Sequence, residues 1–213
     1  RGFQGQIEVG EISVGDEIVS LPSGETAHIK SLHDLNKPVE RAFKGQAVTV
    51  EIDREMDISR GCMICKDVNL HVGKMFTATL LWMDDTKLVA GKNYLLKLGT
   101  KTVPAVIMNI KYKVDVNEGN HVTTDRLYKN EIACCDISCS EKIVFDEFKH
   151  HKELGGFVLI DRVTNMTSAC GVVEHPLRRD DNLTWHNMDI TRQLRAQQKN
   201  QTPKTIWMTG LSG

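Results

Sequence analysis

The sequence predicts an all-β protein with a β-sandwich or β-barrel fold and only a small helical part near the C-terminus. Two observations lead to this prediction. Apolar and polar residues alternate with a period of two over much of the chain, which is typical of strands with one face on a core and one in water. Short glycine- and asparagine-containing turns separate these runs at close intervals, as in sandwiches and barrels.

The alternation is clearest in three segments. Within residues 46–52 and 76–82 every second residue is apolar, so each segment is expected to be a strand with one buried face. The longest run covers residues 106–116, where lysines occupy much of one face. The apolar face of this run is predicted to hold Val106, Met108, Ile110, Tyr112, Val114 and Val116.

Turns are expected where glycine or asparagine can adopt positive φ. These positions are residues 14–16, 22–24, 90–93, 99–100 and 118–120. Helical patterns are weak by comparison: residues 141–153 have poor apolar spacing and are followed at once by two glycines.

Two changes in pattern divide the chain. The first falls near Gly73, ahead of the strand expected from Phe76, and the second falls near Pro176, after which the composition turns polar. Within residues 188–200 there are several helix formers, with Asp189 as an N-cap, and these predict one short helix in a linker. The predicted division is residues 1–74, 75–176, 177–204 (the linker) and 205–213.

Length and charge restrict the classes of function. The 213 residues suffice for two domains of ordinary size. A formal net charge of -1 argues against a dedicated nucleic-acid binder, which usually carries a basic excess. No apolar run approaches the roughly 20 residues of a membrane helix, so no membrane association is expected. The chain opens and stops in mid-pattern, and we expect both ends to lie within a longer protein.

The six cysteines are expected to be free thiols of a cytoplasmic protein, because a chain of this size needs no disulfide for stability. Cys62 and Cys65 form a C-x-x-C pair, which can indicate zinc or redox chemistry. Residues three apart on a strand point to opposite faces, so we favour ordinary buried thiols. Cys135 and Cys139 share one strand face and are predicted to pack in a core.

The remaining polar clusters do not predict a catalytic or metal site. His150 and His151 are adjacent, but the sequence offers no third ligand at a suitable spacing, so a solvated face is favoured. Asp84 and Asp85 are expected to be turn residues and not an acid–base pair. No Ser/His/Asp arrangement is indicated, and we predict no catalytic residue.

The C-terminal residues carry the most specific motif. Residues 205–209 form a short apolar run that leads directly into Gly210, Leu211, Ser212 and Gly213. A strand followed by such residues is how the phosphate-binding loop G-x-x-x-x-G-K-[ST] begins. The second glycine, the lysine and the hydroxyl residue of that motif are not in this chain, so the predicted loop is incomplete.

Several segments resemble known families. Four resemble the second domain of translation-factor-type GTPases: residues 2–5, 14–19, 21–24 and 57–61. Five are similar to the large, GTP-binding subunit of sulfate adenylyltransferase: residues 81–84, 94–105, 115–117, 130–132 and 155–165. Three further segments resemble the adenylylsulfate kinase that is fused to that subunit. Residues 177–179 and 182–186 resemble the junction with the kinase, and residues 207–213 resemble its opening strand and loop.

This resemblance implies two consecutive antiparallel β-barrels, of the translation-factor domain II type in residues 1–74 and the elongation-factor C-terminal (domain III) type in residues 75–176. Gly210–Gly213 would begin the ATP-binding loop of the kinase. The intact protein would couple GTP hydrolysis to the reaction of ATP with sulfate, giving adenylylsulfate and pyrophosphate, and the kinase would add the 3′-phosphate.

The same resemblance implies GTP, ATP and Mg²⁺ as cofactors of the intact protein, and none in this part of it. The implied partners are the small, adenylyl-transferring subunit and the protein's own GTPase and kinase domains. One rival is a translation-factor barrel pair that binds RNA, against which the near-neutral charge argues. A metal or thiol enzyme built on Cys62, Cys65 and the histidines is the weaker rival.

Overall fold

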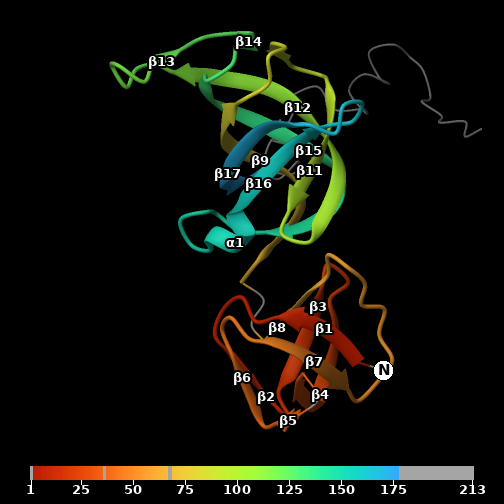
Figure 1. The fold of residues 1–213 in the computed structure, drawn as a ribbon. Helices are drawn as coiled ribbons and strands as arrows, with labels where there is room; N and C mark the ends of the chain where they lie inside the picture. Colours follow the sequence, from red (N-terminus) through yellow and green to blue (C-terminus); the bar gives the residue numbers. More distant parts are fainter. Residues whose placement is uncertain (1, 36, 67–68, 178–213) are drawn as a thin grey trace, which may run out of the picture. The chain divides into compact units, whose positions relative to one another are not determined.

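A computed structural model describes residues 2–35, 37–66 and 69–177. The structure is nearly all-β, with 61% strand and 2% helix, and its strands form β-barrels, as the sequence predicts (Figure 1). The strands divide into two groups that have separate cores. The linker and the short helix predicted beyond residue 177 lie outside the described residues.

The first barrel is built from the strands before residue 66. Its main sheet has the order β1-β7-β4-β3-β8, β5 pairs with β4, and β2 pairs with β6. These strands are β1 (Gly2–Gln6), β2 (Glu11–Ser13), β3 (Glu17–Leu21), β4 (Glu25–Asp34), β5 (Lys37–Val39), β6 (Arg41–Phe43), β7 (Ala47–Ile52) and β8 (Met63–Cys65). Its core holds Ile18, Ala27, Ile29, Leu32, Ala42, Val48, Val50 and Met56.

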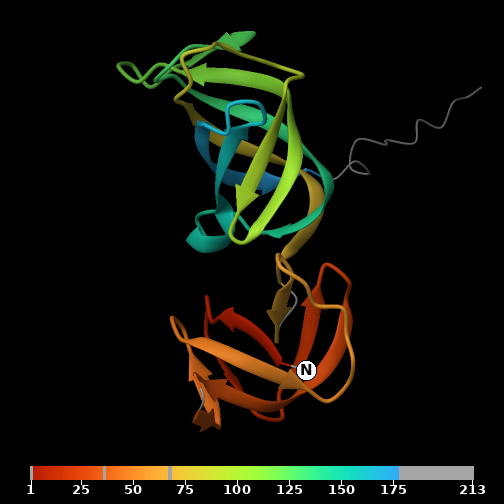
Figure 2. The same cartoon turned by 45° about the vertical axis from the view of Figure 1, so that its right-hand side comes forward.

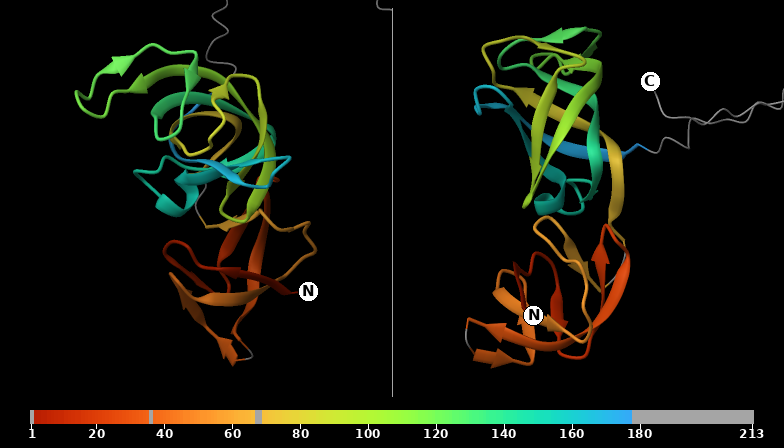
Figure 3. Two further views of the ribbon diagram at one scale, coloured as in Figure 1. Left: turned by 45° about the horizontal axis from the view of Figure 1, so that its top comes forward. Right: turned by 90° about the vertical axis from the view of Figure 1, so that its right-hand side faces the viewer.

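The second barrel closes on itself. Its strands follow the order β11-β16-β17-β9-β15-β12, and β12 pairs with β11 to complete the ring (Figures 1 and 2). They are β9 (His71–Trp82), β11 (Asn93–Leu98), β12 (Lys101–Val114), β15 (Ile132–Phe145), β16 (Gly156–Asp161) and β17 (Thr167–Pro176). Figure 3 (left) shows these strands curving around a common centre. Closure leaves no free sheet edge in the ring.

Short elements complete the second barrel. β13 (His121–Val122) pairs with the end of β12, and β10 (Leu88–Val89) pairs with β14 (Arg126–Leu127). One turn of helix, α1 (Lys152–Gly155), precedes β16. The turns predicted from glycine are confirmed, because all five glycines have positive φ: Gly15, Gly24, Gly91, Gly99 and Gly119.

Large aromatic side chains fill the second barrel. Trp82 and Tyr94 are fully buried and meet edge to face, with ring centroids 5.7 Å apart. Phe157 packs against Phe76 in the same way at 5.6 Å. Gly171 lies opposite Phe157 in the β16–β17 pairing, and a Cβ at that position would come within 2.5 Å of the Phe157 ring. The absence of a side chain at residue 171 therefore makes room for the ring.

The predicted strand over residues 106–116 is correct in type but wrong in its pattern of faces. β12 has irregularities between Ile107 and Asn109 and between Ile110 and Tyr112. Each such bulge shifts the alternation by one residue. As a result Ile107 and Ile110 are both buried, whereas Met108, predicted on the same face as Ile110, is 41% exposed.

Of the two predicted changes of pattern, the first differs from the structure and the second agrees with it. The strand expected from Phe76 begins earlier, at His71, so that the change of pattern predicted near Gly73 falls inside β9. The end of β17 at Pro176 agrees with the predicted change of pattern there. The four-range domain division itself stays a prediction.

Candidate functional site

The predicted phosphate loop, Gly210, Leu211, Ser212 and Gly213, lies outside the described residues. Its assignment to an ATP site stays a prediction. The polar and thiol clusters of residues 2–177 are therefore where the structure can define a site.

The cysteines are all free thiols, as predicted. Cys135 and Cys139 lie in the core of the second barrel, and burial raises the pKa of each thiol to about 12. The prediction that Cys62 and Cys65 are buried is wrong, because both are partly exposed: Cys65 is the last residue of the edge strand β8, and Cys62 directly precedes that strand. Partial burial nevertheless raises the pKa of Cys65 to about 11, which keeps this thiol protonated at neutral pH.

The adjacent histidines approach a buried carboxylate. Asp146, the residue after β15, is 4% exposed, and the His151 ring hydrogen-bonds to its carboxylate. His150 Nδ1 lies 3.6 Å and His71 Nε2 3.8 Å from Asp146 Oδ1. The prediction of a solvated histidine face is therefore wrong for His151. Neither Asp146 nor His71 is singled out by the sequence, because the fold brings them together from distant positions.

Competing effects set the pKa of Asp146. Burial raises it, but the hydrogen bonds from His151 and from the backbone N–H of Glu147 lower it by more, so that the net shift is downward. The carboxylate thus stays ionised and ties the loop before α1 to the first residue of β9.

A second polar cluster lies at the turn between β16 and β17. Asp161, 6% exposed, accepts hydrogen bonds from the backbone N–H groups of Val163 and Thr164, at 2.9 and 3.0 Å. Lys92 Nζ lies 2.8 Å from the other carboxylate oxygen and 5.2 Å from the Tyr94 ring centroid. The Lys92 ammonium and then these backbone donors hold the pKa of Asp161 well below its usual range.

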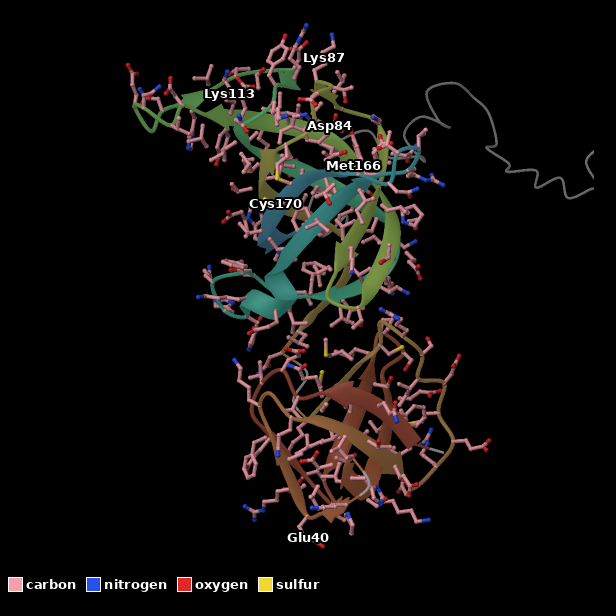
Figure 4. The ribbon with its side chains drawn as sticks, viewed as in Figure 1. Glu40, Asp84, Lys87, Lys113, Met166 and Cys170 are labelled. Atoms are coloured by element: carbon pink, nitrogen blue, oxygen red, sulfur yellow. The ribbon has the colours of Figure 1, made fainter. Side chains whose placement is uncertain are left out.

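Asp84, labelled in Figure 4, is a turn residue as predicted. It accepts hydrogen bonds from the backbone N–H of Thr86 and from Ser168 Oγ, at 2.9 and 2.8 Å. These contacts lower the pKa of Asp84 despite its partial burial. Asp85 is exposed and pairs with Lys129 at 2.6 Å.

A third cluster lies on the outer side of β9, β15 and β12. The Thr77 hydroxyl donates to Asp136 Oδ1 at 2.7 Å and accepts from Lys111 Nζ at 3.1 Å. Lys111 Nζ also lies 3.1 Å from Asp136 Oδ1. These three side chains satisfy one another and cross-link three strands.

Each cluster fixes a loop or joins neighbouring strands. Within residues 2–35, 37–66 and 69–177, no group of three or more His, Cys, Asp and Glu residues has the geometry of a metal site. The same described residues form no helix long and apolar enough to cross a membrane.

A family model and a solved structure show which class of fold the chain has. Residues 75–174 match the family described as GTP-eEF1A C-terminal domain-like. The chain resembles the solved structure of sup35 complexed with GDP with a TM-score of 0.75 and 17% identity, over 83% of this chain and 44% of that one. The described residues therefore have the barrel architecture of the translation-factor domain II and domain III type.

Two proteins of similar sequence narrow this class further. The chain is 37% identical over its whole length to the bifunctional enzyme NodQ of Rhizobium sp. strain N33. It is 38% identical over 81% of its length to sulfate adenylyltransferase subunit 1 of Saccharophagus degradans. The chain is a relative of these two proteins and spans about a third of their length, 33% and 37% respectively.

Proposed function

We propose that the chain forms the barrel portion of the GTP-binding subunit of a sulfate adenylyltransferase fused to adenylylsulfate kinase. In this role the barrels catalyse no reaction themselves. They form a platform between the GTPase domain and the separate, adenylyl-transferring subunit. The whole protein would work in the cytoplasm, where the free thiols of this chain would stay reduced.

The observation that carries the proposal is the similarity to bifunctional NodQ over the entire chain, together with the closed second barrel. A ring of six hydrogen-bonded strands around a core of buried aromatic residues moves as one body. GTPases of this architecture act through switch segments that order and disorder with the nucleotide. A rigid barrel can transmit such a change to a partner that is bound to it.

The chemistry of the whole protein would then be divided among its parts. GTP and Mg²⁺ would bind to the GTPase domain, and ATP with Mg²⁺ to the kinase, whose loop would begin at Gly210–Gly213. The adenylyl transfer from ATP to sulfate would take place on the partner subunit. The barrels would position and move the partner subunit, and none of their side chains would contact the reacting atoms.

Charge pairing speaks against the rival RNA-binding function. Several cations of the second barrel are held by neighbouring carboxylates, which leaves fewer of them for phosphate groups. Lysines with a carboxylate oxygen within about 3 Å include Lys92, Lys111, Lys113 and Lys129.

Light scattering on a sizing column tests the platform role. The chain is mixed with the purified adenylyl-transferring subunit at tens of micromolar, an affinity range that transient interfaces reach. We expect a stoichiometric complex. We also expect no GTP hydrolysis and no phosphorylation of adenylylsulfate by the chain alone; either activity would contradict the non-catalytic role.

Filter binding with RNA across a salt series distinguishes the platform function from the rival RNA-binding function. True phosphate contacts give an affinity that falls steeply with salt. We expect weak binding without such a slope, and a steep slope with sub-micromolar affinity would favour the translation-factor function instead.

A further inference from the structure

The outer side of the second barrel carries a continuous row of apolar residues. Val158 on β16 pairs with Cys170 on β17, and Cys170 pairs with Leu81 on β9. Leu81 pairs with Ile132 on β15, and Ile132 with Val114 on β12. All five side chains are partly exposed, and Cys170 is labelled in Figure 4. We call these five residues the outer apolar row.

The alternation of the strands shows that this row does not belong to the core. The residues next to the row along four of the strands point inward and are at most 1% exposed: Leu159, Ala169, Leu80 and Ala133. An antiparallel sheet with one buried face usually carries polar residues on the other. Here five neighbouring strands place apolar side chains at the same level on the outer face.

The row widens at one end. Leu95 on β11 pairs with Ile160, which lies two residues beyond Val158 on the same face of β16. Val172 follows Cys170 in the same way on β17. These three side chains are also partly exposed. The apolar surface therefore extends over more than one residue level, which a single exposed side chain would not explain.

Two lysines border the row, and within the described part of the chain only one of them is held in an ion pair. Lys97 on β11 pairs with Val158 and borders the row; it is exposed and takes part in none of the ion pairs between described residues. At the other end, Lys113 lies next to Val114 but is held by Glu131, with Nζ and Oε1 2.7 Å apart. The available positive charge at this surface is thus at Lys97.

We propose that the outer apolar row is the docking surface for the adenylyl-transferring subunit, an inference that rests on the function proposed above. The partner presents apolar side chains to the row and a carboxylate to Lys97. Interfaces typically combine an apolar centre with a polar rim. A covered Lys97 needs an opposite charge, since an unpaired ammonium loses its hydration on burial.

Similarity to a named subunit supports this choice of partner. Most of this chain matches a protein called sulfate adenylyltransferase subunit 1, a name that places it in an enzyme of several subunits.

Paired variants test the surface. Leu81→Glu places a carboxylate at the centre of the row while leaving the core side chains unchanged. Val116→Glu makes the same kind of change at a residue that is 69% exposed and lies just beyond β12, outside the row. Titration calorimetry with the partner subunit should show binding weakened at least about tenfold by Leu81→Glu and unchanged by Val116→Glu.

A charge pair of variants tests the predicted carboxylate. Lys97→Glu should weaken binding several-fold, whereas Lys97→Arg should retain it, and the difference should shrink at high salt. Circular dichroism checks that all variants fold. Equal binding by Lys97→Glu and Lys97→Arg would refute the role of Lys97.

The unmodified chain offers an independent readout. Alkylation of Cys170, detected by mass spectrometry, should slow when the partner subunit is present. Cys62, a partly exposed thiol of the first barrel, is the internal control and should react at the same rate with and without the partner. An unchanged Cys170 rate in a formed complex would contradict docking on the row.

The outcomes separate the two proposals. If the unaltered chain binds the subunit and Leu81→Glu binds equally well, the row is not the interface, but the proposed function stands. If the unaltered chain does not bind, both proposals fail. If the chain alone forms a dimer that Leu81→Glu dissociates, the row joins two copies of this chain and the proposed partner is wrong.

Discussion

Leu95 and Leu96 provide a matched test of how β11 is oriented. They are neighbours on one strand, but Leu96 is fully buried in the core of the second barrel while Leu95 is partly exposed on its outside. Leu96→Ala removes buried methyl groups and leaves a cavity in a closed ring that cannot easily collapse. Such substitutions typically lower the free energy of unfolding by about 2–5 kcal/mol.

For a barrel of this size, each kcal/mol corresponds to a change in Tm of about 4–8 °C. Leu96→Ala should therefore lower Tm by about 8–40 °C, whereas Leu95→Ala should lower it by about 5 °C or less. Thermal denaturation monitored by circular dichroism measures both. An equal loss of Tm in the two variants would refute the assignment of inward and outward faces on β11.

Three further outcomes are expected. Gly171→Ala places a Cβ within 2.5 Å of the Phe157 ring and should lower the free energy of unfolding by about 1–3 kcal/mol, measured by urea denaturation. Asp146 has a lowered pKa in the folded state, so its stabilising contribution is complete above the unfolded pKa near 3.8 and is lost as pH falls through the lower folded value. Asp146→Asn should therefore flatten the loss of Tm below about pH 4. Cys135, with its pKa raised to about 12, should be alkylated far more slowly than Cys170 in the native chain.

The fold class could be predicted from the sequence because strand periodicity is a local signal. Val48 and Val50 in β7, and Phe76 in β9, are buried where the alternation places them. The turn glycines were equally visible, since positive φ restricts the residue type at a single position. The helical part is smaller than a helix over residues 141–153 would be, because β15 continues to Phe145 and α1 is a single turn.

Features that depend on contacts between distant residues were not predictable. The bulges of β12 leave no signature in the alternation, and so Met108 was placed on the wrong face. The cluster around Asp146 depends on His71, which only the pairing of β9 with β15 brings near. The outer apolar row arises from the register of five strands, none of which shows it alone.

The path of the chain through the second barrel has a mechanical consequence. β9 is the first strand of the ring and β17 the last, and they are neighbours, so that the backbone N–H of Leu177 donates to the carbonyl of Met75 at 2.9 Å. The chain thus enters and leaves the barrel at one point. The barrel's own hydrogen bonds thus hold together the strand by which the chain enters it and the strand by which the chain leaves it.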